Sequence, residues 1–134
     1  MEMINIRSRQ KSDFIDITSD INSIIPADFS GGCVISSLHT TGGITVNENA
    51  DPDVVHDMLL QLDEMVPWSN PGFKHMEGNS AAHVKTSLMG SSLYLPVENS
   101  RLVLGTWQSV YFCEFDGPRS RRVAVKFFKD AGVA

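Results

Sequence analysis

Apolar and polar residues alternate along much of the chain, which is the pattern of strands with one buried face. Turn residues such as Gly31-Gly32, Asn99-Ser100 and Asp116-Gly-Pro118 separate several of these segments, as they separate strands in hairpins. The segments predicted as strands are residues 14–18, 33–39, 44–48, 92–97, 102–105, 106–115 and 122–128.

Three further segments are predicted to be helical. A long helix starts at Asp51-Pro52, where a capping carboxylate precedes a proline at the first helical position, and it ends at Pro67. A short helix follows Thr18 or Ser19 as its cap and stops at Pro26. The third covers residues 80–89, with Asn79 or Ser80 as its cap and Gly90 as its stop.

The helix predicted over residues 80–89 carries two residues of chemical interest. At about 100° per residue, Ala81, Val84 and Leu88 form one apolar stripe, and His83 projects from the opposite side. Lys85 falls within the stripe. Either its stem passes the core and its amine reaches water, or a partly buried ammonium group beside His83 suits an anionic substrate.

These elements predict one α+β domain over residues 1–134, with antiparallel or mixed sheets and helices packed against them. The hydrophobic share of 42% and the charged share of 20% are those of a globular protein. Net charge is −5, which argues against general binding to nucleic acid or to an anionic membrane. Cys33 and Cys113 lie in apolar runs and are predicted to be buried thiols, so we expect a cytoplasmic protein.

Histidines provide the first candidate chemistry. His39 ends a strand, His75 lies in a loop and His83 lies on a helix, so together they could hold a divalent metal, zinc or magnesium, with one position open. No closely spaced histidine or cysteine pair supports such a site, and surface or hydrogen-bonded histidines remain the alternative. His56 lies on the polar side of the long helix and is predicted to be exposed.

Charged and aromatic residues provide further candidates. Glu48 shares strand parity with Ile44 and Val46 and could act as a general base, or it could serve the helix start together with Asp51. Arg119, Arg121 and Arg122 crowd one turn, where they clamp a phosphate or form a solvated hairpin end. Trp107, next to Gln108, is either a core residue or a surface on which a planar heterocycle stacks.

Four ordered motifs resemble those of the YjbQ family, also called secondary thiamine-phosphate synthase. They are His39-Thr-Thr-Gly-Gly-Ile-Thr-Val-Asn-Glu-Asn-Ala-Asp-Pro-Asp53, Glu77-Gly-Asn-Ser-Ala-Ala-His-Val-Lys85, Leu104-Gly-Thr-Trp-Gln108 and Glu114-Phe-Asp-Gly-Pro-Arg119. The resemblance extends from about Phe14 to Lys129. One departure is Gly42-Gly43, where family members often have alanine, and we expect it to loosen the loop after His39.

The resemblance implies a sandwich-like, β-rich fold flanked by two or three helices, homotrimers, and a polar pocket at or near subunit contacts. It also implies that a pyrimidine diphosphate is joined to a thiazole phosphate with release of pyrophosphate, assisted by a metal. The expected partner is accordingly a small phosphorylated or heteroaromatic substrate. The residues carried over by position are His39, His75 and His83 as metal ligands; Glu48, Asp51, Lys85 and Gln108 as catalytic residues; and Trp107, Arg119, Thr40 and Asn79 as substrate-binding residues.

Two other functions remain open. One is hydrolysis of another small substrate by a metal-bound water with Glu48 as base. The other is a trimeric module that binds a small ligand or stabilises a partner without catalysis. Metal content separates the enzymes from the module, and product analysis with both thiamine precursors separates the two enzymes.

Overall fold

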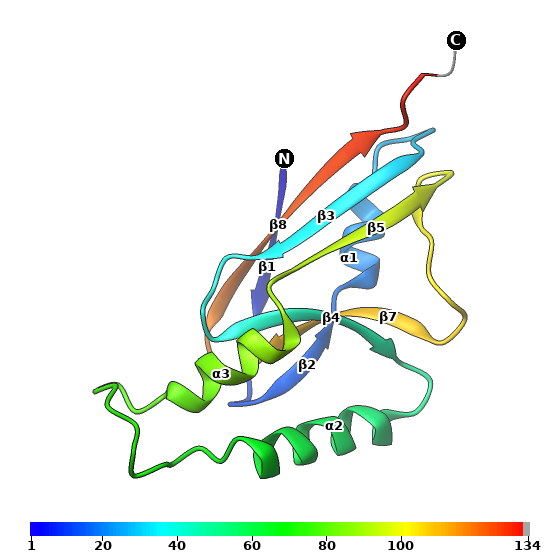
Figure 1. Ribbon diagram of the computed structural model, residues 1–134. Coiled ribbons are helices and arrows are strands. Elements are labelled where there is room, and N and C mark those ends of the chain that lie inside the picture. The colour runs from blue at the N-terminus through cyan, green and yellow to red at the C-terminus, as the bar shows by residue number, and fades with distance from the viewer. Residues whose placement is uncertain (133–134) are drawn as a thin grey trace.

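The computed structural model describes residues 1–132, which form two antiparallel sheets and three helices (Figure 1). The larger sheet has the strand order β1-β8-β3-β5-β6 and the smaller one β2-β7-β4. The larger sheet consists of β1 (Glu2–Arg7), β8 (Ser120–Lys129), β3 (Gly31–Ser37), β5 (Ser92–Glu98) and β6 (Arg101–Leu102). The smaller sheet consists of β2 (Asp13–Asp16), β7 (Gln108–Glu114) and β4 (Gly42–Glu48).

The smaller sheet lies between the larger sheet and two of the helices. Its central strand β7 is buried on both faces, because Val110 and Phe112 pack toward the larger sheet while Tyr111 and Cys113 pack toward α2 (Pro52–Met65) and α3 (Ser80–Met89). The helix α1 (Thr18–Ile24) adds Ile21 to the core that contains Val110 and Phe112. This layered arrangement confirms the predicted α+β class with flanking helices.

Several local predictions are confirmed. Asp51 caps α2, since its carboxylate accepts the Asp53 N–H over 2.9 Å, and the proline follows at the helix start. Both cysteines are free and buried, and burial raises the pKa of the Cys33 thiol to about 11. His56 on α2 is exposed. Among residues 1–132, no helix is both long and apolar enough to cross a membrane.

Other local predictions are wrong. The strand β1 is missing from the prediction although Ile4 and Ile6 alternate with polar residues in it. The strand expected over residues 102–105 is only the two-residue β6. No side chain caps α1; Thr18 is already inside this helix, and its hydroxyl accepts the Val110 N–H of β7.

The buried face of α3 also differs from the prediction. Val84 and Leu88 are 41% and 56% exposed, and the face that packs on the sheet carries Ala81, Ala82, Lys85 and Thr86. This face carries mostly short side chains because α3, together with Gly90 at its C-terminal end, packs closely against β4. A Cβ built at Gly43 of β4 would lie 2.6 Å from the Gly90 carbonyl oxygen, so only short side chains or flexible stems fit between the two elements.

The two glycines after His39 do not loosen a loop. Gly42 and Gly43 lie in β4 and pair with Glu114 and Cys113 of β7. The ring of Phe112 occupies the space that a Cβ at Gly42 would need, with a closest approach of 2.3 Å. This segment is therefore ordered strand against which an aromatic ring packs.

Candidate functional site

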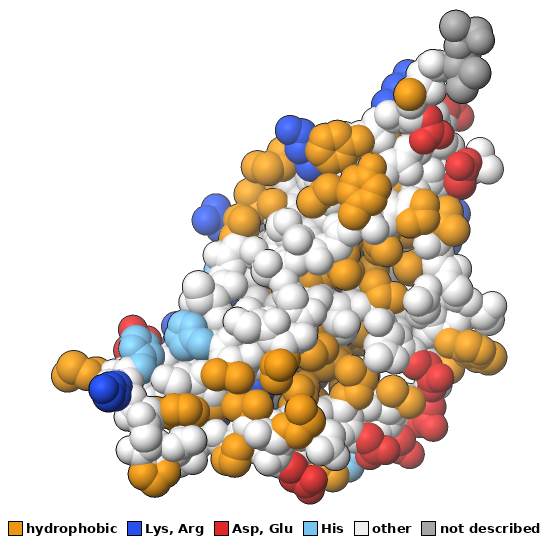
Figure 2. Space-filling model, in the orientation of Figure 1, with side chains coloured by type: hydrophobic (Ala, Val, Ile, Leu, Met, Phe, Trp, Pro, Cys, Tyr) orange, Lys and Arg blue, Asp and Glu red, His pale blue; other side chains and the backbone are white. Residues whose placement is uncertain are grey.

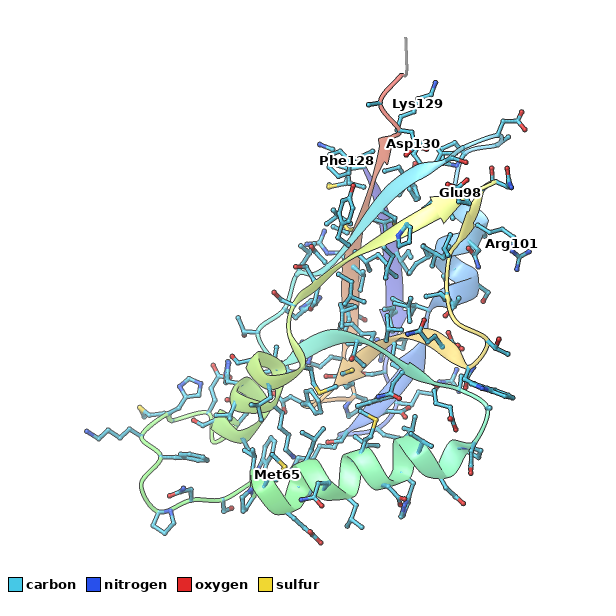
Figure 3. The ribbon with its side chains drawn as sticks, turned by 45° about the vertical axis from the view of Figure 1, so that its right-hand side comes forward. Met65, Glu98, Arg101, Phe128, Lys129 and Asp130 are labelled. Carbon is cyan, nitrogen blue, oxygen red and sulfur yellow. The ribbon has the colours of Figure 1, made fainter. Side chains whose placement is uncertain are left out.

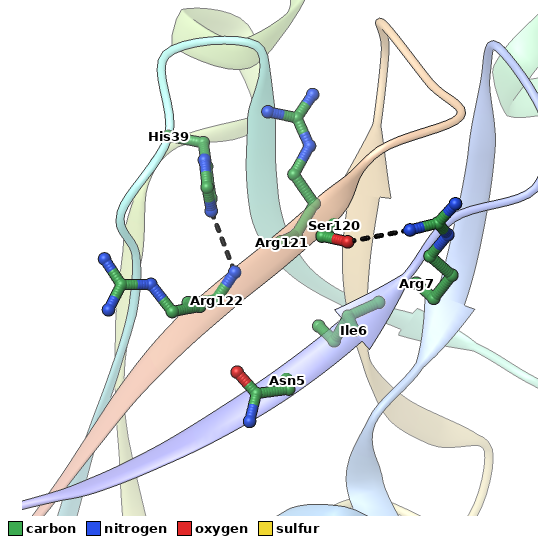
Figure 4. Close-up of a pocket in the computed structure, with 7 residues that line it drawn as sticks. All are labelled: Asn5, Ile6, Arg7, His39, Ser120, Arg121 and Arg122. Carbon is green, nitrogen blue, oxygen red and sulfur yellow. Dashed lines mark hydrogen bonds between the residues drawn. The ribbon is translucent and has the colours of Figure 1, made fainter.

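His39 lies in the short connection between β3 and β4, which hydrogen bonds hold in place. The Ser37 hydroxyl donates to the Gly42 carbonyl oxygen over 2.6 Å and accepts the His39 N–H over 3.2 Å. The Arg122 N–H of β8 donates to His39 Nε2 over 2.8 Å (Figure 4). The imidazole is thereby fixed beside the start of β8.

This hydrogen bond defines the protonation of His39. Because Nε2 accepts, the neutral ring carries its proton on Nδ1. Burial lowers the pKa of His39, and the positive charge of Arg121 lowers it further against the opposing effect of Glu114. His39 is therefore a neutral imidazole at neutral pH whose Nδ1–H can donate to a ligand.

A buried ion pair between Glu114 and Arg121 lies beneath His39. Arg121 Nε donates to Glu114 Oε1 over 2.8 Å, and Arg121 Nη2 donates to Glu114 Oε2 and to the Thr41 hydroxyl. The Ser8 hydroxyl donates to Glu114 Oε1 over 2.6 Å. Burial raises the pKa of Glu114, but the hydrogen bonds from Arg121, Ser8 and the Asp116 N–H outweigh it and lower the pKa below its ordinary value.

Asn79 places a buried acceptor next to this pair. Its Nδ2 donates to Asp116 Oδ2 over 2.9 Å, which fixes the amide orientation and leaves Oδ1 as an acceptor. Within residues 1–132, Asn79 Oδ1 is buried and has no hydrogen-bond partner. Arg119 Nη2 donates to the same Asp116 carboxylate over 2.9 Å. An unpaired buried acceptor is costly, so a donor on a ligand or a water would satisfy this atom.

The side chains around His39 enclose a cleft of about 390 Å³, which we call the histidine cleft. His75 and His83 meet there edge to face, with ring centroids 5.5 Å apart. In the space-filling view, histidine side chains gather at one tip of the molecule near the start of α3 (Figure 2). The lining residues are Leu38, His39, Thr40, Thr41, His75, Glu77, Asn79, His83, Arg119 and Arg121.

A second cleft of about 430 Å³, the arginine cleft, adjoins the first on the outer side of β1 and β8. His39 and Arg121 line both clefts, so one imidazole separates them. The remaining lining residues are Asn5, Ile6, Arg7, Ser120 and Arg122 (Figure 4).

The predicted metal ligands His39, His75 and His83 share the histidine cleft, but their arrangement does not fit a three-histidine centre. Within the described part of the chain, no group of three His, Cys, Asp or Glu side chains converges enough to hold a metal ion. The accepting nitrogen of His39 is also occupied by the Arg122 N–H, whereas a metal needs a free lone pair. The metal stays a prediction, and no step below depends on it.

Four of the other predicted residues lie at the opposite end of the smaller sheet. Glu48 pairs with Gln108 at one end of the β4–β7 ladder and Gly42 pairs with Glu114 at the other. Six residues of strand separate these ends by about 20 Å. Glu48, Asp51, Trp107 and Gln108 form this group, which we call the acidic end.

Within the acidic end, the side chains have local roles. Gln108 Oε1 accepts the Gly105 N–H over 2.7 Å, and Asp51 caps α2. Trp107 is 64% exposed, so the core interpretation of this tryptophan is wrong. Acidic side chains gather over the start of α2, on the opposite side of the view from the two histidines near the start of α3 (Figure 2). A small ligand in the histidine cleft of one chain therefore cannot touch the acidic end of the same chain.

Lys85 is only 3% exposed, and its ammonium group pairs with Asp63 of α2. It is not among the residues that line the two clefts described above. The pair joins α3 to α2 beneath the smaller sheet. A catalytic role for Lys85 stays a prediction.

The sequence analysis did not identify Arg7, Ser8, Glu114 or Asp116 as parts of this site. Parity offered a signal for the buried pair, because Arg121 shares a strand face with Val123 and Val125 and must meet a carboxylate when buried. Arg7 had no such signal, because the strand β1 was not predicted.

Comparison with known proteins gives a consistent result. The family model described as UPF0047 protein YjbQ-like matches residues 2–130. The UPF0047 protein YugU of Bacillus subtilis is 48% identical over 128 residues, covering 94% of this chain and 97% of that protein. A UPF0047 protein of Methanocaldococcus jannaschii is 45% identical over 127 residues, covering 93% and 91% of the two chains.

Solved structures share the fold. A YjbQ/UPF0047 family protein from Clostridium acetobutylicum superposes with a TM-score of 0.91 at 46% identity, covering 96% of this chain and 100% of the other. A conserved hypothetical protein from Thermus thermophilus superposes with a TM-score of 0.92 at 39% identity, again covering 96% and 100%. The two-sheet arrangement with flanking helices is therefore that of these crystal structures.

Proposed function

The chain belongs to the UPF0047 family, described as YjbQ-like, and from this membership we propose that it is an enzyme acting on small phosphorylated heterocycles. The proposed reaction joins a pyrimidine diphosphate to a thiazole phosphate and releases pyrophosphate, giving thiamine phosphate. The histidine cleft carries the proposal, because it gathers Arg119, His39 and the buried acceptor of Asn79 in a chain of net charge −5.

The proposed reaction places specific demands on the cleft. The ring nitrogen of the thiazole forms a bond with the methylene carbon of the pyrimidine, and the carbon–oxygen bond to the diphosphate breaks. The bonding electrons leave with pyrophosphate, so negative charge grows on the departing oxygen. Preorganised donors lower the barrier to such a step. Arg119 and the Nδ1–H of His39 are such donors, and His83 lines the same cleft.

The polar groups of the cleft also suit the heterocycle. Asn79 Oδ1 is fixed as an acceptor, and an amino substituent on a pyrimidine supplies the N–H that it lacks. The Thr40 hydroxyl lines the same cleft and can donate or accept. A site that leaves a buried acceptor unpaired without its ligand discriminates strongly against analogues that lack the donor.

Homotrimer formation is the second part of the proposal, with the acidic end of one chain against the histidine cleft of the next. Repeated head-to-tail contacts of this kind close into a ring when the rotation matches. Exposed Trp107 at one end and exposed Val84 and Leu88 beside His83 at the other offer the apolar area that the contact needs.

A cytoplasmic location completes the proposal. The free, buried thiols of Cys33 and Cys113 support it, because a reducing compartment keeps cysteines unpaired. Both precursors of the proposed reaction are phosphorylated metabolites of the kind that cells hold inside.

An assay of purified protein with both precursors tests the reaction. Thiamine phosphate and pyrophosphate should form together, and Arg119→Gln should lower kcat about a hundredfold because it removes a charged donor. Arg101→Gln, on an exposed arginine of β6, is the matched control and should leave the rate unchanged. Release of phosphate from one precursor alone would instead favour the hydrolase, and no turnover of either would favour the binding module.

A mixing experiment tests the shared site. His83→Gln and Glu48→Gln should each be inactive alone, because each damages one half of every site. After the two are unfolded and refolded together, about a quarter of the sites should combine two intact halves and regain activity. No recovery in mixed trimers would show that Glu48 and His83 do not serve one site.

A further inference from the structure

The arginine cleft holds a strong positive charge that no carboxylate balances. Asn5 pairs with Arg122 and Arg7 pairs with Ser120 across the β1–β8 ladder, so all four side chains lie on the same outer face of the larger sheet. Arg7 and Arg122 supply two guanidinium groups, and none of the residues that line the cleft is acidic. In a chain of net charge −5, this concentration of positive charge is local.

The two guanidinium groups are not occupied by the rest of the protein. Within residues 1–132, the Arg122 side chain makes no hydrogen bond or ion pair, and Arg7 donates only to the Ser120 hydroxyl, over 3.0 Å. The third arginine of the cleft, Arg121, is neutralised by Glu114. Arg7 and Arg122 are thus the groups left to bind a ligand (Figure 4).

The donor set selects the chemistry of the ligand. Arginine offers only N–H donors, and the Asn5 amide can add another. Phosphate oxygens accept hydrogen bonds and pair with guanidinium groups in two parallel bonds. Sheet-borne side chains such as these are also held more rigidly than side chains on a loop.

We propose that the arginine cleft is a binding site for a phosphate or diphosphate group, with Arg7 and Arg122 as its anchors and His39 at its border. The backbone N–H of Arg122 holds the His39 ring, so the side chain of the same residue couples the bound anion to that imidazole. The site is independent of the proposed reaction, because it needs only an anion and no thiamine precursor.

Titration of the purified protein with inorganic pyrophosphate, and separately with inorganic phosphate, tests the site by calorimetry at constant ionic strength. We expect Arg122→Gln and Arg7→Gln each to weaken pyrophosphate binding about tenfold, the loss of one charge-assisted contact. Arg101→Gln is the matched control, since Arg101 is exposed at the far end of the larger sheet (Figure 3). This variant should bind as the wild type does.

His39 supplies a second readout by NMR. His39 lines the arginine cleft, so saturating pyrophosphate should shift the ring resonances of His39, and Arg122→Gln should abolish the shift. Equal binding by wild type, Arg7→Gln and Arg122→Gln would overturn the proposal. Weakening by Arg119→Gln alone would also overturn it, because the anion would then occupy the histidine cleft.

Discussion

The buried pair of Glu114 and Arg121 is the residue-scale feature with the largest expected effect on stability. Glu114→Gln removes the charge but keeps the shape, and it leaves the Arg121 guanidinium buried without a counter-charge. Breaking one partner of a buried pair costs about 3–5 kcal/mol. Urea unfolding followed by circular dichroism should show this loss in the free energy of unfolding.

The control for this variant is Glu98→Gln, on an exposed carboxylate at the end of β5 (Figure 3), which should change stability little. Acidification provides a second check. Because the folded pKa of Glu114 is lowered, its contribution is complete above the unfolded carboxyl pKa and is lost as pH falls through the lower folded value. Parallel stability curves for wild type and Glu114→Gln below neutral pH would contradict this account.

Individual residues show what the sequence could and could not predict about the site. The positions of His39 and Arg119 in motifs marked them as candidates, and both line the histidine cleft. The hydrogen bond from the Arg122 N–H to His39 joins residues 83 positions apart, so only the register of β8 against the neighbouring loop determines it. The tautomer of the imidazole follows from that contact and therefore could not be predicted from the sequence.

At the scale of elements, the α3–α2 contact gives the next prediction. Lys85 packs its stem in the interior while its amine pairs with Asp63 on the exposed side of α2. Lys85→Met keeps the stem volume and leaves only an exposed carboxylate unpaired, so we expect a change below about 1 kcal/mol. Lys85→Ala leaves a cavity and should cost about 2 kcal/mol or more.

Denaturant midpoints of these two variants, compared with wild type, measure the difference. Similar large losses in both would mean that the ammonium charge itself stabilises the fold. Asp63→Asn is the converse variant, because it leaves the buried ammonium group without its acidic partner, and it should cost more stability than Lys85→Met.

The elements were predicted unequally well for a physical reason. α2 has both its start signal and a regular apolar stripe on a partly exposed face. The sequence pattern therefore predicts correctly where α2 begins and which of its faces packs on the protein. α3 lies so close to Gly43 that small residues form its buried face and larger apolar ones face outward. A helical wheel places the larger apolar residues on the buried face, which is the opposite of what α3 shows. The sequence alone does not reveal how closely a helix packs against its neighbouring helix or sheet.

At the scale of the molecule, the same motifs that identify the family separate into two groups. His39 and Glu48 are nine residues apart and belong to one motif, yet β4 runs between them and carries them to opposite ends of the smaller sheet. Sequence order therefore suggested one site, whereas a single chain holds these two residues at separate ends of the sheet. This separation is the reason for proposing that two chains share one site.

The apolar surface of α3 beside His83 gives the assembly prediction. Leu88→Glu places a carboxylate where the proposed neighbouring chain packs, so the mass in light scattering should fall from three times 14.8 kDa to 14.8 kDa at micromolar concentration. Leu60→Glu on α2 is the matched control, because Leu60 is 51% and Leu88 56% exposed, and it should remain trimeric. Unchanged circular dichroism in both variants excludes unfolding as the cause. A trimer that survives Leu88→Glu would place the contact elsewhere. A monomeric wild type would contradict the proposal that the acidic end of one chain and the histidine cleft of another form one site.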